Sequence, residues 1–211
     1  MLVSEMMVTD VATVTEEDSL NRAFKILYER HHRVLPVLDD GKLCGLLTER
    51  MLAEVRPSKA TALSVYELNY LMSRTKVRDI MKKDVFTINP EALIEDAASI
   101  MYTNGIGSLP VVRKDKTLVG IVTQTDIFRA LIILMGVDLE GIRIAIDVQD
   151  DVGVIANISQ ILADEKINII SISNYLKSDR RHEVVLKLEA TEISGATEKL
   201  TQAGYRVTSV H

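Results

Sequence analysis

The sequence has few of the residues on which several classes of protein depend. Its 211 residues include one cysteine, Cys44, so a disulfide within the chain is excluded, and a single thiol is compatible with a reducing compartment. Tryptophan is absent and only three phenylalanines occur, which leaves core packing to aliphatic side chains. Cys44 stands between Leu43 and Gly45 with no sequence neighbour that would lower its pKa. We therefore interpret it as a small strand residue rather than a reactive thiol.

Concentrated positive charge and long apolar runs are also missing. Lysine and arginine together number 25 against 30 acidic residues, a net charge of −5, and no basic cluster occurs. Because binding to phosphate backbones needs a concentrated basic surface, we expect no nucleic-acid partner. Residues 130–137 form an apolar stretch far shorter than the roughly 20 residues that span a bilayer, and residues 1–7 are too short and polar for a signal peptide. We expect no membrane partner and a cytoplasmic location.

What the sequence does contain is an internal repeat: residues 3–52 recur as residues 77–128. One extra residue in the charged turn 113–117 changes the offset from 74 to 75, and it aligns Gly45 with Gly120. Insertions confined to surface turns are what a duplicated fold unit tolerates. The matching motifs are Met7-x-x-Asp10-Val11-x-Thr13-Val14 with Met81-x-x-Asp84-Val85-x-Thr87-Ile88, Leu35-Pro36-Val37 with Leu109-Pro110-Val111, and Gly45-Leu46-Leu47-Thr48 with Gly120-Ile121-Val122-Thr123.

Each copy predicts the element order β-α-β-β-α. In the first copy, apolar residues at helical spacing follow a short strand. Asp39-Asp40-Gly41 then predicts a hairpin between two strands. A unit of this size cannot bury its own faces, so the two copies should pack on each other. An apolar pattern over residues 63–73 predicts a helix in the connection.

The pattern changes after residue 140. Apolar residues alternate along residues 142–148, as in a half-buried strand, and the following segments predict a helix, two strands, a second helix and a last strand. The order β-α-β-β-α-β is typical of a ferredoxin-like fold, with a four-stranded antiparallel sheet covered by two helices. The chain as a whole is therefore of the mixed α/β (α+β) class. We expect four segments: 1–53, 54–75 as a helical connector, 76–135, and 141–211.

These patterns resemble two known families. The repeat, Leu-Pro-Val, and a Gly-h-h-Thr-x-x-Asp motif (h, aliphatic) ending at Asp126 are similar to a tandem pair of CBS domains. Asp150-Asp151-Val152-Gly153-Val154-Ile155 together with Ile167-Asn168-Ile169 resembles an ACT domain. A CBS pair followed by an ACT domain is similar to the acetoin utilization AcuB-type proteins. The resemblance implies a regulatory, ligand-sensing protein that binds an adenine nucleotide (AMP, ADP, ATP or S-adenosylmethionine), with a regulated enzyme as a partner. We expect a homodimer, because both modules should expose sheet edges and helix faces.

The resemblance also implies a nucleotide site at the second copy. Asp126 is expected to accept hydrogen bonds from both ribose hydroxyls, because a carboxylate offers two acceptor oxygens to a vicinal diol. Met51 stands at the equivalent position of the first copy and cannot do this, so we expect a degenerate cleft there, where Thr48 and Thr87 remain. The other expected nucleotide contacts are Thr123, Thr125, Ile121, Thr13 and Val37, with His32 and Arg33 near the phosphates.

Simpler interpretations of the same residues stay open. Thr125-Asp126 can be an ordinary N-cap for a helix over residues 127–134, which is compatible with phosphate binding nearby. His31-His32-Arg33 can be a solvated helix end. We do not expect a metal site from His31 and His32, because adjacent histidines point in different directions and lack a third ligand.

For the ACT-like segment, the resemblance implies an effector site, for example for an amino acid, at Asp150, Gly153, Val154 and Asn168. Val148 and Val152 replace the polar residue and the proline that are usual there, and Asn168 can instead satisfy a turn at the start of a strand. No catalytic motif occurs, and we expect no enzymatic activity. The alternative function is a structural or scaffolding partner protein of acetoin metabolism with vestigial ligand sites.

Overall fold

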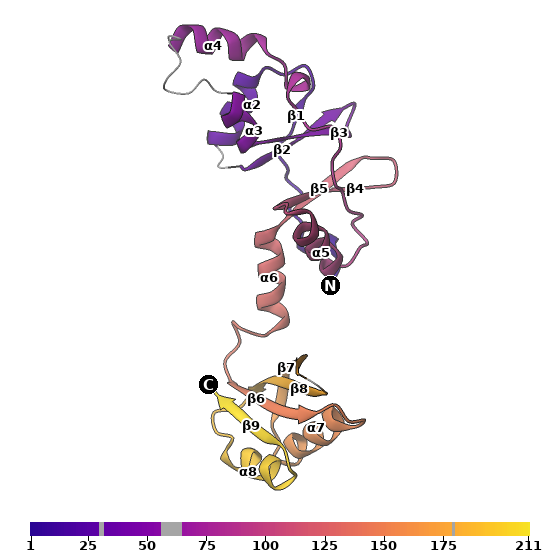
Figure 1. The fold of residues 1–211 in the computed structure, drawn as a ribbon, viewed down its shortest axis with the longest axis vertical. Coiled ribbons are helices and arrows are strands. Elements are labelled where there is room, and N and C mark those ends of the chain that lie inside the picture. Colours follow the sequence, from indigo (N-terminus) through magenta and orange to yellow (C-terminus); the bar gives the residue numbers. More distant parts are fainter. Residues whose placement is uncertain (30–31, 56–64, 179) are drawn as a thin grey trace. The chain divides into compact units, whose positions relative to one another are not determined.

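The computed structural model describes residues 1–29, 32–55, 65–178 and 180–211, which form two compact units, Met1–Phe128 and Arg129–His211 (Figure 1). The first unit holds both copies of the repeat, and the second holds the sheet of the C-terminal segment. In the described parts of the chain, no helix is both long and apolar enough to cross a membrane.

The first copy consists of β1 (Val14–Thr15), α2 (Leu20–Glu29), β2 (Val34–Asp39), β3 (Lys42–Thr48) and α3 (Glu49–Val55). Strand β1 runs parallel to β2, and β2 runs antiparallel to β3. The predicted hairpin between β2 and β3 is confirmed: Asp40 (φ 46°) and Gly41 (φ 75°) both adopt the left-handed conformation that a tight two-residue turn requires.

The second copy consists of α5 (Ile94–Asn104), β4 (Ser108–Val112), β5 (Leu118–Thr123) and α6 (Gln124–Leu134). Helix α5 ends at Gly105, which adopts the left-handed conformation that glycine tolerates best. The first strand of the β-α-β-β-α order predicted for each copy is reduced in this copy to a single parallel bridge, Ile88 to Val111. The predicted connecting helix is α4 (Val65–Arg74), while residues 63 and 64 lie outside the described residues.

Apolar residues at helical spacing build the core of the first copy. Leu20, Ala23 and Leu27 of α2 are buried, because they form one stripe of the helix that faces the core, and Phe24 and Ile26 pack partly buried beside it. Residues of β2 and β3, Met72 of α4 and Met81 complete the same cluster. The core of the first copy therefore includes residues that follow it in the chain.

The two copies exchange their leading segments. Helix α1 (Val3–Met6) begins the first copy but packs on α5 of the second, and the one-turn helix η1 (Val77–Asp79) begins the second copy but joins the core of the first. Four isolated β-bridges also connect the start of one copy to the other copy, and they form two pairs at equivalent positions of the repeat. They are Leu2 with Leu93, Ser19 with Lys76, Val8 with Ile121, and Leu46 with Lys82.

The repeated glycine permits this exchange. A Cβ atom on Gly120 would lie 2.6 Å from the sulfur of Met7 and 2.9 Å from the Val8 carbonyl oxygen. A Cβ atom on Gly45 would meet the sulfur of Met81 at the same distance, 2.6 Å. Glycine therefore recurs at this position because the incoming methionine segment passes too close to the strand for any side chain.

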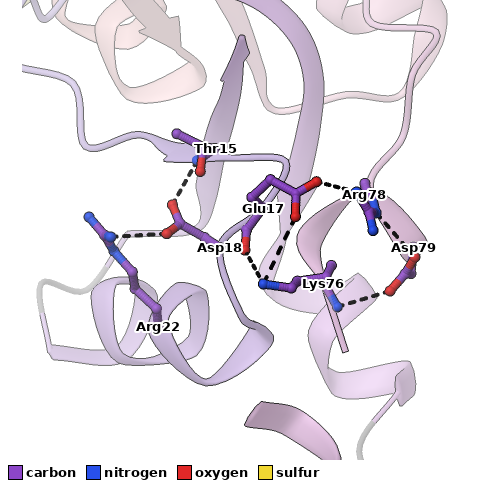
Figure 2. A network of polar contacts seen from close by, with 7 residues as sticks. All are labelled: Thr15, Glu17, Asp18, Arg22, Lys76, Arg78 and Asp79. Atoms are coloured by element: carbon purple, nitrogen blue, oxygen red, sulfur yellow. Dashed lines mark hydrogen bonds and ion pairs between the residues drawn. The ribbon is translucent and has the colours of Figure 1, made fainter. Parts of the chain in front are cut away.

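A polar network holds η1 against the first copy (Figure 2). The Lys76 ammonium group donates to the Glu17 carbonyl oxygen at 2.6 Å, and Arg78 pairs with the Glu17 carboxylate. Asp18 accepts from the Thr15 backbone N–H at 2.8 Å and from Arg22 at 2.9 Å. Since most of these side chains are exposed, each pair contributes at most about 1 kcal/mol, and the network mainly fixes the geometry of the exchange.

The second unit confirms the predicted βαββαβ order. It consists of β6 (Ile142–Gln149), α7 (Val154–Asp164), β7 (Asn168–Ser178), β8 (Arg181–Glu189), α8 (Ser194–Gln202) and β9 (Arg206–Val210). The strands form one antiparallel sheet in the order β7-β8-β6-β9. Alternate residues of β6 and β8 pack with α7 and α8 into a single core.

Two acidic residues are buried elsewhere in this sheet. Asp147 of β6 lies directly opposite Glu183 of β8, an arrangement that is unfavourable for like charges. Hydrogen bonds from Arg181 and Arg206 lower the pKa of Asp147, and hydrogen bonds from Lys177 and Tyr175 lower that of Glu183. Each carboxylate therefore has its own donors, which offset the repulsion between them.

Candidate functional site

A cavity of about 700 Å³ lies in the first unit, where the ends of the two hairpins meet residues 8–12, near the start of the first copy. Its polar side chains come from both copies, and its apolar ones come from that segment, from β2, from β5 and from α6. The lining residues are Val8, Asp10, Val11, Ala12, His32, Arg33, Val34, Thr48, Gly107, Ser108, Ile121, Thr123, Gln124, Thr125 and Phe128.

Helix α6 begins at this cavity. Thr123 precedes its first residue, and both the Thr123 backbone N–H (2.9 Å) and its hydroxyl (2.7 Å) donate to Oδ2 of Asp126. Asp126 thus satisfies a backbone donor that a helix start otherwise leaves unpaired. The predicted N-cap was wrong in position: the helix starts at Gln124 rather than at residue 127, because Asp126 caps from inside the first turn.

In the first copy, the hydrogen bond between the equivalent residues runs in the opposite direction. There the Thr48 hydroxyl accepts a hydrogen bond from the Met51 backbone N–H at 3.2 Å, because Met51 has no acceptor to offer. The sequence placed Thr48 in a separate, degenerate cleft, but the structure places it in the same cavity as Thr123. The two copies thus contribute different residues, Asp126 and Met51, at equivalent positions close to the same cavity.

The two residues expected near phosphates, His32 and Arg33, also line this cavity. The Arg33 carbonyl oxygen accepts from the Glu49 backbone N–H at 3.0 Å, which fixes the chain where β2 starts beside α3. The first turn of α6, represented here by Gln124 and Thr125, faces the same space. A cationic side chain and a helix N-terminus both attract anions, so this side of the cavity suits a phosphate. His31 lies outside the described residues.

Some of the expected nucleotide contacts line this cavity, and others lie elsewhere in the first unit. Ile121, Thr123 and Thr125 line the cavity with His32 and Arg33, and Asp126 lies behind them, 7% exposed. Val37 is fully buried in the core of the first copy, because its side chain points to the helix side of β2. Thr13 is not among the lining residues either, and its neighbour Ala12 lines the cavity.

The sequence missed the contribution of the exchanged segment. Val8, Asp10, Val11 and Ala12 belong to the first copy by sequence, but Val8 pairs with Ile121 through two backbone hydrogen bonds of 2.9 Å. The repeated Met-x-x-Asp-Val motif marked this segment. Its position against the other copy follows only from contacts between residues far apart in the chain.

The expected effector site in the second unit is divided within one chain. Asp150, Gly153 and Val154 line a hollow of about 130 Å³ together with Asn174 and His182. Asn168 instead donates to Glu189 at 3.0 Å in a different hollow. Because β6 and β7 are both antiparallel to β8, their starting ends lie at the same end of the sheet. Asn168 is therefore a strand length, roughly 25 Å, from Asp150.

Within the ranges that the structure describes, no group of three or more histidine, cysteine or acidic side chains could hold a metal ion. Burial and a hydrogen bond with Glu16 raise the pKa of the Cys44 thiol to about 11, and its sulfur donates to the Val37 carbonyl oxygen at 3.3 Å. Cys44 is therefore a protonated strand residue at neutral pH.

Among curated proteins, a homoserine O-acetyltransferase from Methanohalobium evestigatum is 35% identical over 130 residues, which cover 61% of this chain and 24% of that protein. A CBS domain-containing protein from Dictyostelium discoideum is 32% identical over 132 residues, covering 62% of this chain and 91% of its own. The chain spans less than half the length of the first curated relatives that it matches. The acetyltransferase activity is therefore not carried over from the first of them.

Three solved structures cover the CBS-like part. The CBS domain pair of protein MJ0100, in complex with 5′-methylthioadenosine and S-adenosyl-L-methionine, is 26% identical with a TM-score of 0.51, covering 62% of this chain and 99% of that one. CBSX2 in complex with AMP is 28% identical with a TM-score of 0.52, covering 62% and 96%. A protein from Vibrio cholerae described as an acetoin utilization protein (AcuB) is 29% identical with a TM-score of 0.54, covering 65% and 95%.

The family models account for almost the whole chain. The CBS domain model matches residues 3–58 and 77–133, more than half of the sequence, and the model of the TTHA0829-like ACT domain matches residues 140–211. Both matches agree with the observed folds, a duplicated β-α-β-β-α unit and a βαββαβ sheet. The chain therefore belongs to the CBS-domain family and carries its CBS pair ahead of a C-terminal ACT domain.

Proposed function

We propose that this chain is a non-catalytic regulatory protein whose CBS pair binds an adenine nucleotide in the 700 Å³ cavity. One observation carries the proposal: the cavity gathers aliphatic side chains, hydroxyl groups and the guanidinium group of Arg33 from segments far apart in the sequence. A volume of this size lies within the usual range for small-molecule sites. Two structural neighbours were solved with AMP and with S-adenosyl-L-methionine, which supports the ligand class.

In the proposed complex, each part of the ligand meets matching chemistry. The base packs on Ile121 and Val8, the ribose hydroxyls donate to Asp126, and the phosphate lies near Arg33 and the first turn of α6. The Thr123 N–H and the Thr123 hydroxyl both donate to Oδ2 of Asp126. The proposed ribose contact therefore relies on Oδ1 and on the second lone pair of Oδ2.

The proposed mechanism is a shift between conformations. A ligand held by residues of both copies favours one packing of the copies over others, by as much as its affinity differs between them. We propose that the ACT domain binds a small effector such as an amino acid, and that the chain acts as a homodimer on a regulated enzyme. We also propose that the protein belongs to acetoin utilization, which the description of the Vibrio cholerae neighbour supports. The domain limits 1–53, 54–75, 76–135 and 141–211 remain part of this proposal.

Thermal denaturation with AMP, ADP, ATP and S-adenosylmethionine tests the function. Saturation at 100 times Kd should stabilise the protein by about 2.7 kcal/mol. The Asp126→Asn variant keeps a carbonyl acceptor for the N–H of Thr123 but loses the carboxylate charge, so it should lose most of the ligand response. Met51→Leu, a volume-conserving change at the equivalent position, is the matched control.

The outcomes separate the alternatives. A response in the wild type and Met51→Leu, but not in Asp126→Asn, supports both the function and the site. A full response in Asp126→Asn refutes the ribose contact. No response to any of the four ligands refutes the sensor function and favours a scaffolding protein with vestigial ligand sites.

A further inference from the structure

Helices α7 and α8 pack on one face of the C-terminal sheet (Figure 1). Alternate residues of β6 and β8 point to these helices, so the residues between them lie on the opposite face, which we call the open face. The open face belongs wholly to the second unit. Within the described parts of its strands, its charged residues are Arg143, Lys177, Arg181, Lys187, Arg206, Asp147, Glu183 and Glu189.

Each acidic residue of the open face binds a donor from the same unit. The pairs are Asp147 with Arg181 (2.7 Å) and with Arg206, Glu183 with Lys177 (2.7 Å), and Glu189 with Asn168 (3.0 Å). Arg143 and Lys187 differ from the other cationic residues, because neither forms an ion pair with any acidic side chain that the structure describes. The open face therefore carries two positive charges that the unit itself does not balance.

These two charges stand directly opposite each other, Arg143 on β6 and Lys187 on β8. Like charges at such positions destabilise a sheet. A hydrogen bond to Glu183 raises the pKa of Tyr175 and the charge of Arg143 acts against that rise, so the guanidinium group lies near the phenol, over the face. An unfavourable pair that is left without compensation is a local conflict of the kind expected at functional sites.

We propose that Arg143 and Lys187 form the centre of a docking surface for an acidic surface of another protein, whose carboxylate groups bind between the two cationic side chains. The guanidinium group can bind a carboxylate through two parallel hydrogen bonds, and the ammonium group adds a second positive charge. This inference rests on the proposed function only where that function gives the chain a partner protein. It is independent of which nucleotide the cavity binds.

The same observations argue against other occupants. An isologous contact through the open face would bring the cationic faces of two copies together, which is unfavourable. Sheets that bind single-stranded RNA stack two or three bases on aromatic side chains. Tyr175 is the one aromatic residue among the described residues of the open face, and its hydroxyl group is bound to Glu183. Neither Arg143 nor Lys187 lines the hollows of this unit described above, so a small ligand has no enclosed site there.

Fluorescence anisotropy of a labelled decaglutamate peptide mixed with the full chain tests the proposal. The peptide should bind at low ionic strength and bind more weakly as the salt concentration rises. The double variant Arg143→Gln/Lys187→Gln should bind it about 10-fold more weakly or less, because both unbalanced charges are lost. The matched control, Lys166→Gln/Lys199→Gln, removes the same charge from the same unit away from the open face and should bind within about twofold of the wild type.

Thermal denaturation gives a second, independent measurement. Lys187→Gln should melt about 1–4 °C higher than the wild type, because it relieves the repulsion across the two strands. Arg181→Gln changes the same face but should melt lower, because it removes a donor from the buried carboxylate of Asp147. A purely structural role for Lys187 would instead lower the melting temperature.

The proposal is overturned if the peptide does not bind up to about 1 mM, if the double variant binds it like the wild type, or if Lys187→Gln melts lower. It is also overturned if decauridine RNA or phosphatidylserine vesicles bind more tightly than the peptide. The thermal response to nucleotide, measured on the same double variant, separates this result from the proposed function. The cavity lies in the first unit, so that response should be unchanged whether or not the peptide binds.

Discussion

Replacing Gly120 with alanine should displace the segment 7–12, part of which lines the cavity, from strand β5. The new Cβ would lie 2.6 Å from the sulfur of Met7 and 2.9 Å from the carbonyl oxygen of Val8. The methionine side chain can move, but the Val8 backbone is held to Ile121 by two hydrogen bonds of 2.9 Å. Relief of the clash therefore requires the exchanged segment to leave β5, and this segment supplies four of the residues that line the cavity.

The magnitude follows from two contributions. Overpacking of a closely packed site costs about 1–3 kcal/mol, and each weakened backbone hydrogen bond about 0.5–1.5 kcal/mol. With both Val8–Ile121 bonds weakened, we expect the free energy of unfolding of Gly120→Ala to fall by about 2–6 kcal/mol, measured by urea denaturation followed by circular dichroism. The thermal response to nucleotide should fall with it, because Val8 and Asp10 are displaced.

Gly45→Ala is the matched control in the other copy. Its Cβ would meet the sulfur of Met81 at the same 2.6 Å, but the nearest backbone atom, the Lys82 carbonyl oxygen, is 3.2 Å away. Lys82 is also not among the residues that line the cavity. Gly45→Ala should therefore destabilise the protein less and preserve the nucleotide response. The reasoning is refuted if the two variants respond equally to nucleotide, or if Gly120→Ala unfolds like the wild type.

Three further results are expected. The carboxyl pKa values of Asp147 and Glu183 are lowered in the folded state. The two ionised carboxylates therefore stabilise the fold above the ordinary carboxyl pKa range, and this stabilisation is lost as the pH falls through the lowered values. An acid titration followed by circular dichroism should show the loss, and Asp147→Asn should make it smaller. Cys44, with its pKa raised from 9.0 to about 11, should react with a maleimide about 100-fold more slowly at pH 8 than in the unfolded chain, and equal rates would contradict its burial. Arg33→Gln should weaken binding of AMP more than binding of adenosine, measured by calorimetry, whereas an equal loss for both ligands would remove Arg33 from the phosphate side.

Local features of the fold could be predicted from the sequence because they depend on neighbouring residues. The spacing of Leu20, Ala23 and Leu27 fixes the buried stripe of α2, and Asp40-Gly41 fixes the hairpin turn. The alternation along residues 142–148 fixes which side of β6 faces the helices. In each case the evidence lies within about one turn of helix or a few strand residues.

The site could be predicted only in part, because it depends on contacts between distant segments. Ile121 and Thr123 belong to one motif that ends at the cavity, so their common location followed from the motif. The burial of Val37 depends on which side of β2 faces its helices, and the division of the effector residues Asp150 and Asn168 depends on the direction of β7. Local sequence patterns could not predict that the two copies exchange the segments around α1 and η1, since each segment is compatible with either copy.

That exchange has a consequence for how such a pair can arise. A polypeptide with only one copy and its leading segment would leave the groove beside its glycine empty, because the methionine that fills the groove comes from the other copy. Two such polypeptides could complete each other by trading segments, as in a domain-swapped dimer. The present chain has the form of that dimer joined by a covalent linker, and the linker lets the two halves diverge, so that a carboxylate is retained at Asp126 while its counterpart is Met51.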